Sequence, residues 1–408
     1  MLKFYNFIVI IAAQVLKIGA LFSPKLKLFV NGRKNTFDTL QSKIKPTDRS
    51  IWFHCASLGE YEQGLPVIEQ IKRAYPNHKL VLSFFSPSGY EIRKNNTLAD
   101  ATVYLPLDTK QNAKKFIHLI QPDLVFFIKY EFWPNYLVEL KNKHIKTYLI
   151  SGIFRPNQIF FKWYGTFYRT ALQGFERFFV QNESSKKLLQ SIGFNNVQIS
   201  GDTRFDRVQS ILTQDNTLDY IAAFKNHCTT IVIGSSWPKD ELIISQFINT
   251  APQNCKFIIA PHNIKTEQIA NLKAQINKKT VLFSNKQNST LSDCQVFIID
   301  TIGLLTKIYS YADIAYVGGG FGNPGVHNIL EPAAFGVPIV LGPNYSHFAE
   351  ATALVHQEGC SVIKNQIELT DTFTNLIANI DIRKEKGHIC ETFVTMNTGA
   401  TARILNNL

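Results

Sequence analysis

The sequence predicts an α/β protein made of two Rossmann-like, doubly wound domains that face a central cleft. Short apolar runs alternate with amphipathic stretches from Ser50 to about Ile199, and the same alternation starts again after Asp219. This alternation is typical of a parallel sheet covered by helices. A chain of 408 residues is long for one core and favours two domains. With 45% hydrophobic against 18% charged residues, it can bury both cores.

In the first half of the chain, the apolar runs predict buried strands and the stretches between them predict helices. The predicted strands are Ser50–Cys55, Lys79–Phe85, Leu124–Ile128, Lys146–Ile150 and Arg177–Gln181. The predicted helices are Glu62–Tyr75, Lys110–Ile120, Asn135–Lys143 and Ser184–Ile192.

The second half repeats this pattern after a polar stretch, Gly201–Asp219, that is expected to be a hinge. Its predicted strands are Thr230–Gly234, Lys256–Ala260, Thr280–Phe283, Val296–Ile299, Ile314–Val317 and Pro338–Leu341. The predicted boundaries are an N-terminal helical segment at 1–30, a first domain at 31–205, a linker at 206–218 and a second domain at 219–408. In such sheets ligands bind beyond the carboxyl ends of the strands, so the loops there are the candidate sites.

The N-terminal segment, residues 1–30, is predicted to be a membrane-associated helix. Its apolar run from Phe4 to Phe22 is about the shortest that crosses a bilayer, and Lys17 interrupts it. Basic residues follow closely, at Lys25, Lys27, Arg33 and Lys34. If the helix spans the membrane, the positive-inside rule leaves the large domains in the cytoplasm. A helix that lies in the interface or packs on the body is an equal alternative.

The charge and the cysteines restrict the partners and the compartment. A net charge of +12 indicates an anionic partner. The basic residues are spread along the chain without an Arg-rich run or zinc-finger spacing, so a membrane surface or a phosphorylated substrate is favoured over nucleic acid. The six scattered cysteines contain no C-x-x-C pair, which indicates free thiols in a reducing compartment and no zinc site.

In the first predicted domain, acidic and aromatic residues follow two strands. Ser50–Cys55 is followed by Ala56-Ser57-Leu58-Gly59-Glu60, which leads into a helix. Glu60 is either a general base, which must reach a substrate hydroxyl, or an acid that interacts with the helix dipole. Leu124–Ile128 is followed by Lys129-Tyr130-Glu131-Phe132-Trp133-Pro134. These side chains line a site, or Trp133 packs against the helix that Pro134 starts.

In the second predicted domain, Ser235 and Ser236 follow a strand and precede a helix. Hydroxyls and free N–H groups at such a turn suit an anion. His262 follows the next strand and either contacts a nucleotide or is an ordinary loop residue.

The glycine-rich stretch from Gly318 to Pro332 is the strongest local signal, because glycines let a phosphate approach the backbone N–H groups. Its match to G-x-G-x-x-G does not indicate a dinucleotide site, since Pro324 interrupts it and no acid follows at the ribose-binding distance. His327, Asn328 and Glu331 are expected to share one helix face. Glu331 suits ribose hydroxyls, whereas the alternative is a glycine-rich turn with a capped helix.

Four of these motifs, in this order, resemble the Kdo transferases, inverting enzymes that transfer 3-deoxy-D-manno-octulosonic acid (Kdo) and have the two-domain fold called GT-B. The motifs are Ala56-Ser57-Leu58-Gly59-Glu60, Glu131-Phe132-Trp133-Pro134, Gly201-Asp202-Thr203-Arg204-Phe205-Asp206 and His327-Asn328-Ile329-Leu330-Glu331. The resemblance covers about Trp52 to Glu350. The chain departs from the family pattern at Lys129, Leu304 and Val326, and in the adjacency of Pro261 and His262.

The resemblance implies roles for the site residues. On the acceptor side, the first domain supplies Glu60 as general base, together with Ser57, Gly59, Glu131 and Trp133. The second domain binds CMP-Kdo, with Ser235 and Ser236 at the phosphate, His262 at the nucleotide, and Asn328 and Glu331 at the phosphate and ribose. Gly303, Gly325 and His327 are assigned to the same donor site.

The implied reaction transfers Kdo to a lipid A precursor, lipid IVA, in lipopolysaccharide biosynthesis at the cytoplasmic side of the inner membrane. No metal or other cofactor is expected, and no nucleic-acid partner. Two alternatives stay open: another GT-B enzyme that uses a UDP-sugar, and a non-catalytic nucleotide-sugar-binding protein at the membrane.

Overall fold

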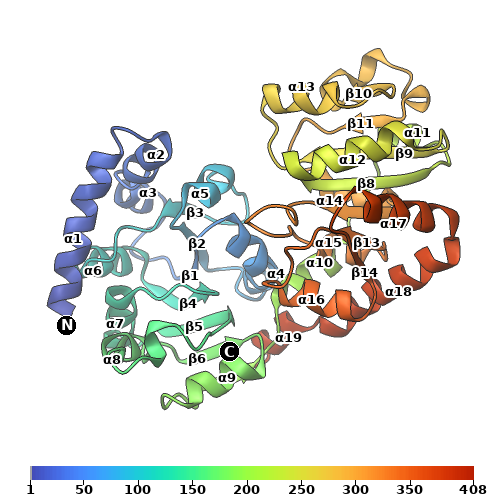
Figure 1. Cartoon of the computed structure of the whole chain (residues 1–408). Helices are drawn as coiled ribbons and strands as arrows, with labels where there is room; N and C mark the ends of the chain where they lie inside the picture. The colour runs from blue at the N-terminus through green and yellow to red at the C-terminus, as the bar shows by residue number, and fades with distance from the viewer. Residues whose placement is uncertain (1) are drawn as a thin grey trace. The chain divides into compact units, whose positions relative to one another are not determined.

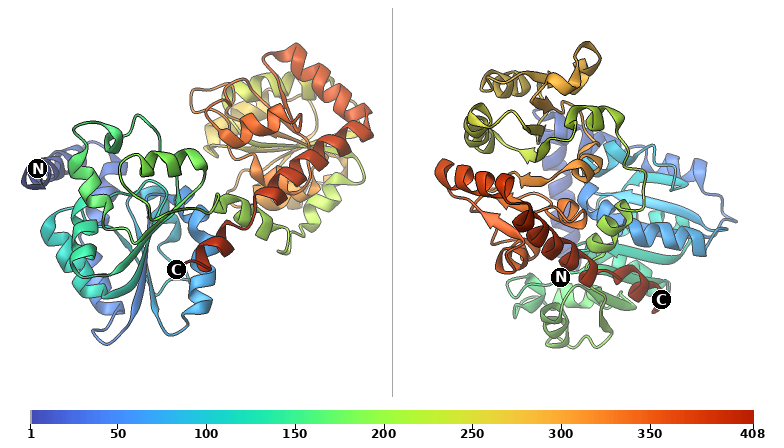
Figure 2. Two further views of the ribbon diagram at one scale, coloured as in Figure 1. Left: turned by 90° about the horizontal axis from the view of Figure 1, so that it is seen from below. Right: turned by 90° about the vertical axis from the view of Figure 1, so that its right-hand side faces the viewer.

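The computed structural model describes residues 2–408, so Met1, the first residue of the predicted segment 1–30, lies outside the described residues. The chain forms two compact units (Figure 1). The first unit is the chain up to Arg207 together with Thr398–Leu408, and the second unit is Val208–Asn397. The predicted fold class is confirmed, because each unit is built on one parallel sheet with helices on both faces (Figure 2).

The first unit contains a seven-stranded sheet in the order β3-β2-β1-β4-β5-β6-β7, in which every pair of neighbours is parallel. The strands are β1 (Ser50–Cys55), β2 (Lys79–Phe84), β3 (Ala101–Tyr104), β4 (Pro122–Ile128), β5 (Lys146–Gly152), β6 (Arg177–Val180) and β7 (Val197–Ile199). The helices are α1 (Leu2–Gly19), α2 (Pro24–Gly32), α3 (Thr36–Lys43), α4 (Leu58–Ala74), α5 (Pro87–Arg93), α6 (Lys110–Ile120), α7 (Pro134–Asn142), α8 (Thr166–Leu172), α9 (Glu183–Gln190) and α19 (Ala400–Leu405).

The second unit contains another seven-stranded parallel sheet, in the order β10-β11-β9-β8-β12-β13-β14. The strands are β8 (Thr229–Ser236), β9 (Cys255–Pro261), β10 (Thr280–Leu282), β11 (Val296–Ile298), β12 (Ile314–Val317), β13 (Ile339–Leu341) and β14 (Cys360–Val362). The helices are α11 (Asp219–Lys225), α12 (Pro238–Thr250), α13 (Thr266–Ala274), α14 (Leu305–Ile308), α15 (Leu330–Ala334), α16 (Ala349–His356), α17 (Gln366–Ala378) and α18 (Ile380–Asn397).

The strand order fixes where each unit can hold a ligand. In the first sheet the order of strands reverses between β1 and β4, and in the second it reverses between β8 and β12. Loops that leave the carboxyl ends of two such strands run in opposite directions and leave room for a ligand between them. The candidate sites therefore lie after β1 and β4 in the first unit, and after β8 and β12 in the second.

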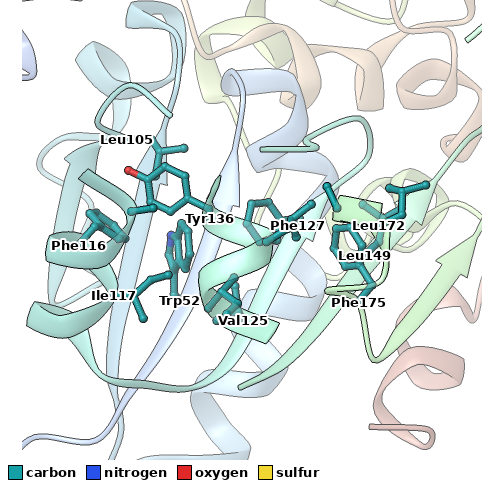
Figure 3. Close-up of a cluster of buried hydrophobic side chains, with 14 of the residues drawn as sticks. Trp52, Leu105, Phe116, Ile117, Val125, Phe127, Tyr136, Leu149, Leu172 and Phe175 are labelled. Atoms are coloured by element: carbon teal, nitrogen blue, oxygen red, sulfur yellow. The ribbon is translucent and has the colours of Figure 1, made fainter. Parts of the chain in front are cut away.

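The strands carry continuous apolar runs because both faces of each sheet are covered. All six residues of β1 are buried. On one face of the first sheet, Trp52 packs against Phe116, Phe127 and Tyr136, with ring centroids 4.9–5.7 Å apart (Figure 3). The Trp52 indole N–H donates to Ser83 Oγ at 2.7 Å, so this large ring is buried without an unpaired polar atom.

The N-terminal segment consists of two helices, α1 and α2, separated at Ser23. One side of α1 is held by the body of the first unit: the Tyr5 hydroxyl donates to Asp108 Oδ2 at 2.8 Å, and Asn135 Nδ2 donates to Asn6 Oδ1 at 2.8 Å. Its opposite side exposes a row of large apolar residues, Phe4, Phe7, Ile8, Ile11, Val15 and Ile18. Within residues 2–408, no helix combines the length and the apolarity needed to cross a bilayer.

The C-terminal end of the chain belongs with the first unit, although the sequence had placed it in the second domain. Asp206 accepts hydrogen bonds from the backbone N–H of Gly399 and Thr401, and Arg403 Nε donates to the Ser200 carbonyl at 2.7 Å. Ile404 is fully buried in the core of the first unit. The expected hinge also differs in form, since Thr203–Ile211 is a helix, α10.

Candidate active site

In the first unit, Glu60 lies in the first turn of α4, directly after β1. Ser57 precedes this helix in an extended conformation, and its hydroxyl donates to Glu60 Oε2. Gly59 lies between them, and a Cβ atom at this position would lie 3.8 Å from the Ser57 hydroxyl oxygen. A carboxylate in a first helical turn is stabilised by the helix dipole, and one oxygen stays available for a substrate proton. Both interpretations of Glu60 made from the sequence therefore fit its position.

Glu131 follows β4 and is joined to β1 by His54. The His54 side chain is fully buried and its Nε2 lies 2.9 Å from Glu131 Oε2. The Trp133 indole N–H donates to the same Glu131 oxygen at 2.8 Å. Pro134 starts α7 as the sequence predicted. The Trp133 ring packs against the core of the first unit while its N–H faces Glu131, so both interpretations of Trp133 fit its position.

A chain of hydrogen bonds lies behind Glu131 and holds the His54 ring in place. Ser83 Oγ receives the Trp52 N–H at 2.7 Å and lies 2.8 Å from His54 Nδ1. The Glu131 carboxylate accepts, so His54 Nε2 is the donor of that pair, whereas the Ser83 hydroxyl has one proton and two acceptor lone pairs and can pair with Nδ1 in either direction. His54 and Ser83 were missed from the sequence because both lie inside apolar strands.

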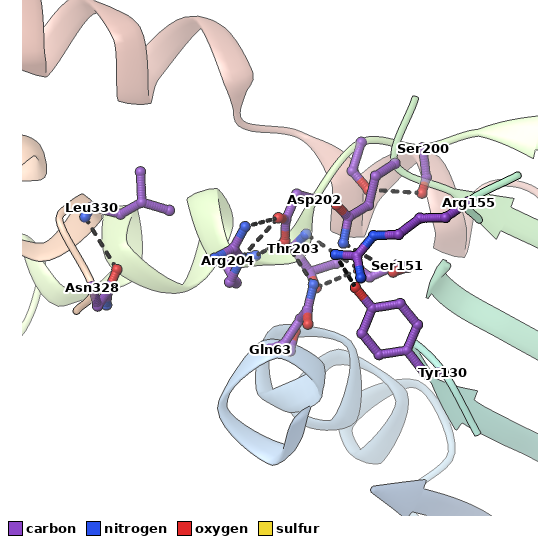
Figure 4. A network of polar contacts seen from close by, with 12 residues as sticks. Gln63, Tyr130, Ser151, Arg155, Ser200, Asp202, Thr203, Arg204, Asn328 and Leu330 are labelled. Atoms are coloured by element: carbon purple, nitrogen blue, oxygen red, sulfur yellow. Dashed lines mark hydrogen bonds and ion pairs between the residues drawn. The ribbon is translucent and has the colours of Figure 1, made fainter. Parts of the chain in front are cut away.

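The Gly201–Asp206 motif has a structural role (Figure 4). Asp202 Oδ1 accepts hydrogen bonds from Gln63 Nε2 at 2.8 Å and from the Arg204 N–H at 2.9 Å. The Thr203 hydroxyl lies 2.7 Å from Ser151 Oγ. These contacts connect the loop after β7 to α4 and β5, while Asp206 holds the C-terminal end of the chain. The motif therefore supports the helix that carries Glu60.

In the second unit, Ser235 and Ser236 end β8. Ser235 has a left-handed backbone, with φ of 54°. The Ser236 hydroxyl is buried and donates to Glu241 Oε1 at 2.9 Å, and burial raises the pKa of Glu241. Of the two predicted phosphate-binding hydroxyls, Ser236 is thus directed at α12, whereas Ser235 is only partly buried.

Asp240, in α12, holds the glycine-rich loop that follows β12. Its fully buried carboxylate accepts the Trp237 N–H at 2.9 Å, the Gly319 N–H at 2.9 Å and the Tyr316 hydroxyl at 2.8 Å. Gly319 has φ of 95°, and a side chain there would run into the Gly325 carbonyl. Gly325 itself has φ of 78°, with Phe348 and the Asn344 carbonyl in close contact. The glycines of this loop are required by its packing, whatever ligand it binds.

Three aromatic rings stack beside this loop. The ring of His262 lies 4.5 Å from both the Trp237 and the His327 rings, and the Trp237 indole N–H donates to His327 Nε2 at 2.8 Å. Burial, with a smaller effect of His262, lowers the pKa of His327 to about 4, and burial also lowers the pKa of His262. Both rings are therefore neutral near pH 7, so they offer flat surfaces and hydrogen bonds instead of positive charge.

Asn328 and Glu331 meet, but not on one helix face as the sequence predicted. The helix α15 begins at Leu330, so His327 and Asn328 lie in the irregular segment before it. Asn328 Oδ1 accepts the Leu330 N–H at 3.1 Å, and its Nδ2 donates to Glu331 Oε1 at 3.0 Å. The prediction was wrong because the Asn328 side chain starts the helix from outside it.

Thr306, in α14, was not identified from the sequence. Its hydroxyl donates to Glu331 Oε2 at 2.9 Å, so both carboxylate oxygens of Glu331 are oriented. Gly303 lies three residues earlier with φ of 90° and open space beside it. Among residues 2–408, no three His, Cys, Asp or Glu side chains are grouped closely enough to hold a metal ion.

Two Rossmann-like units, each with polar residues at its strand-order reversal, define a protein of the GT-B class. Among solved structures, the chain is similar to the UDP-GlcNAc 2-epimerase from Neisseria meningitidis bound to UDP-GlcNAc, with a TM-score of 0.61 and 16% identity over 88% of this chain and 98% of that chain. It is also similar to Acinetobacter baumannii MurG, with a TM-score of 0.54 and 11% identity over 88% and 98%. At these identities the likeness shows the fold alone.

Sequence relatives identify the family. The family model described as 3-deoxy-D-manno-octulosonic-acid transferase (kdotransferase) matches residues 31–207. The 3-deoxy-D-manno-octulosonic acid transferase of Chlamydia trachomatis serovar D is 30% identical over 389 residues, which are 88% of this chain and 87% of the relative. The enzyme of that name from Chlamydophila psittaci is 28% identical over 366 residues, 85% and 83% of the two chains. The chain belongs to the Kdo transferase family and is a glycosyltransferase.

Proposed function

We propose that this protein transfers Kdo from CMP-Kdo to the lipid A precursor lipid IVA in lipopolysaccharide biosynthesis. The observation that carries this assignment is the pair of carboxylates at the strand-order reversal of the first unit. Glu60 follows β1 and Glu131 follows β4, and each is oriented by a hydrogen-bond donor. The family relationship supports Kdo as the transferred sugar.

Glu60 is proposed as the general base. Its carboxylate takes the proton of an acceptor hydroxyl as that oxygen forms a bond to the anomeric carbon of Kdo. The bond from this carbon to the CMP phosphate breaks, and its electron pair stays on the phosphate oxygen. A one-step displacement of this kind inverts the anomeric centre, and it requires no metal because CMP leaves as a charged phosphate stabilised by N–H donors.

The donor is proposed to bind at the second unit. Glu331, held by Thr306 and Asn328, suits the ribose hydroxyls, and the loop from Gly318 to Gly325 suits the phosphate. The neutral His262 and His327 rings suit a flat base. His327, Gly303 and Ser235 stay proposed donor contacts, as the family resemblance implied. Ser236 supports them through Glu241.

The protein is proposed to act at the cytoplasmic surface of the inner membrane, through its first unit. The exposed apolar row of α1, with Leu21 and Phe22 beyond it, suits the interface between headgroups and acyl chains. The net charge of +12 favours an anionic surface. Two further aromatic side chains of the first unit are exposed just before α8: Trp163 is 89% exposed and Tyr164 is 52% exposed.

Mass spectrometry of lipid IVA incubated with the protein and freshly generated CMP-Kdo tests the proposal. We expect a product heavier by one or more Kdo residues. No mass increase, with an active control enzyme alongside, would exclude this acceptor. Thermal-shift measurements with CMP and UDP then separate a Kdo transferase from a UDP-sugar enzyme, and donor hydrolysis separates either from a protein that only binds.

A further inference from the structure

A cavity of about 230 Å³ lies in the first unit, between α1, α2, α3 and the segment after β3. Its apolar walls come from all four segments, namely from Ala13, Leu16, Val30, Phe37 and Leu107. An apolar cavity of roughly 150 Å³ already holds a benzene molecule, so this one has room for a longer piece of hydrocarbon.

The polar side chains of the cavity lining are three basic residues and Asn112. Lys17 and Lys34 line it and are exposed, so their ammonium groups are at its solvent side. Arg33 lies deeper and is fixed by three carbonyls, those of Phe29, Phe85 and Leu105, at 2.6–2.9 Å. Apolar walls with cations at the solvent side match a lipid that carries an acyl chain and anionic phosphate groups.

The cavity is connected to the candidate active site by aromatic side chains. Phe29, in its wall, packs on Phe85 with ring centroids 5.2 Å apart, and Phe85 packs on Trp133 at 4.6 Å. The Trp133 indole N–H then donates to Glu131 at 2.8 Å. Phe85 follows β2 and Leu107 follows β3, so the cavity and both site carboxylates lie at the same edge of the parallel sheet.

We propose that this cavity binds one acyl chain of the acceptor lipid while the acceptor sugar lies at Glu60 and Glu131. This inference rests on the proposed function, since it names the part of the acceptor that the first unit recognises apart from its sugar. The aromatic connection favours the acceptor over a membrane phospholipid, because it leads from the cavity to Glu131 in the candidate active site. Each buried methylene contributes about fourfold in affinity.

Ala13→Phe fills the cavity from α1, and Ala12→Phe is its matched control. Ala12 is the preceding residue on the exposed side of the same helix and does not line the cavity. In detergent, we expect Ala13→Phe to raise the KM for lipid IVA at least tenfold with kcat kept. The KM for the same acceptor stripped of its acyl chains should not change. Leu107→Trp, which fills the cavity from the opposite wall, should repeat this result if Ala13→Phe disturbs α1.

Several results would overturn the inference. An equal effect of Ala13→Phe on the acylated and the stripped acceptor would mean that it acts on the fold. No effect from either filling variant would mean that the cavity binds no acceptor chain. If Ala13→Phe instead weakens binding to phosphatidylglycerol vesicles and leaves the KM for lipid IVA unchanged, the cavity holds a membrane phospholipid.

Binding of lipid IVA, followed by native mass spectrometry in detergent, tests the cavity without catalysis. We expect the wild-type protein and Ala12→Phe to retain the lipid and Ala13→Phe to lose it. Retention without any Kdo transfer would refute the proposed function and keep the cavity assignment. Equal retention by all three proteins would refute the cavity assignment alone.

Discussion

His54 Nε2 lies 2.9 Å from Glu131 Oε2, and this contact ties the end of β1 to the loop after β4. The two strands flank the point where the order of the first sheet reverses. A buried side chain of one strand therefore orients the carboxylate carried by the other. The Ser83 hydroxyl and the Trp52 indole complete the support behind it.

Replacing His54 is expected to reduce both turnover and stability. His54→Ala removes one of the two hydrogen-bond partners of Ser83 Oγ and one of the two partners of Glu131 Oε2, at a cost of about 1–3 kcal/mol in the free energy of unfolding. Urea unfolding and kcat, measured on the same preparation, check this. His78→Ala removes a histidine that contacts Asp123 elsewhere in the unit. It is the control for the loss of stability that follows when any histidine contact is removed. An unchanged kcat in His54→Ala would mean that His54 does not position Glu131 for the reaction.

Glu60→Gln keeps the size of the side chain but removes the proposed base. We expect kcat to fall by about 10²–10⁴-fold, while CMP affinity, measured by calorimetry, stays at the wild-type value. Glu62→Gln is the matched control, because Glu62 lies two residues along α4 and pairs with Arg93 and Arg207. A Glu60→Gln enzyme with near-normal turnover would mean that another group accepts the proton.

Asp240→Asn is expected to loosen the glycine-rich loop. The amide replaces one acceptor oxygen by a donor and cannot accept all three hydrogen bonds that Asp240 receives. We expect faster hydrogen exchange at the Gly319 amide, weaker CMP binding and a loss of about 1.5–3 kcal/mol in stability. Tyr316→Phe removes only one of these donors and should have a smaller effect. Equal exchange rates in Asp240→Asn and wild type would contradict this view.

The stability of the protein should fall on acidification because of His327. The pKa of this histidine is lowered to about 4 in the folded chain, against about 6.5 when unfolded. Between these values the unfolded chain binds a proton that the folded chain does not, so the free energy of unfolding decreases as the pH falls from 6.5 towards 4. Unfolding curves at pH 7, 6 and 5 measure this slope. His327→Gln should flatten it, and an unchanged slope would assign it to other groups.

The C-terminal helix is expected to be needed for the first unit. Ile404 is fully buried there, so Ile404→Ala should cost about 2–5 kcal/mol. Met396→Ala, at a position 80% exposed in α18, is the control and should have little effect. Hydrogen exchange that is faster in α4, against which α19 packs, would locate the loss in the first unit. If hydrogen exchange in α4 stays as slow as in the wild type, the packing of α19 is not needed for the stability of the first unit.

The central strands could be predicted from the sequence because both their faces are buried. The runs at β1, β4, β5, β8 and β9 are apolar throughout most of their length, and each prediction agrees with the structure to within two residues at either end. The strands that were missed, β3, β7 and β14, have three or four residues and contain Thr102, Gln198 and Ser361. Each lies at the edge of its sheet, and an apolar run this short that contains a polar residue shows too little of the strand pattern to be recognised.

The positions of Glu60 and Glu131 could be predicted because each follows closely on an apolar strand, β1 and β4, whereas their roles stay predictions. His54, Asp240 and Thr306 were missed because their importance depends on partners far along the chain, such as Glu131 and Gly319. The assignment of α19 failed for the same reason, since Asp206 and Thr401 are 195 residues apart. Local patterns carry no information on such contacts.

The return of the chain to the first unit reverses the order in which the two units are completed during translation. Although the first sheet emerges from the ribosome early, Ile404 and the partners of Asp206 are made only after the whole second unit. The second unit, Val208–Asn397, is contiguous and has its whole sequence before them. A nascent chain that stops before Thr398 thus contains a complete second unit and a first unit that still lacks part of its core.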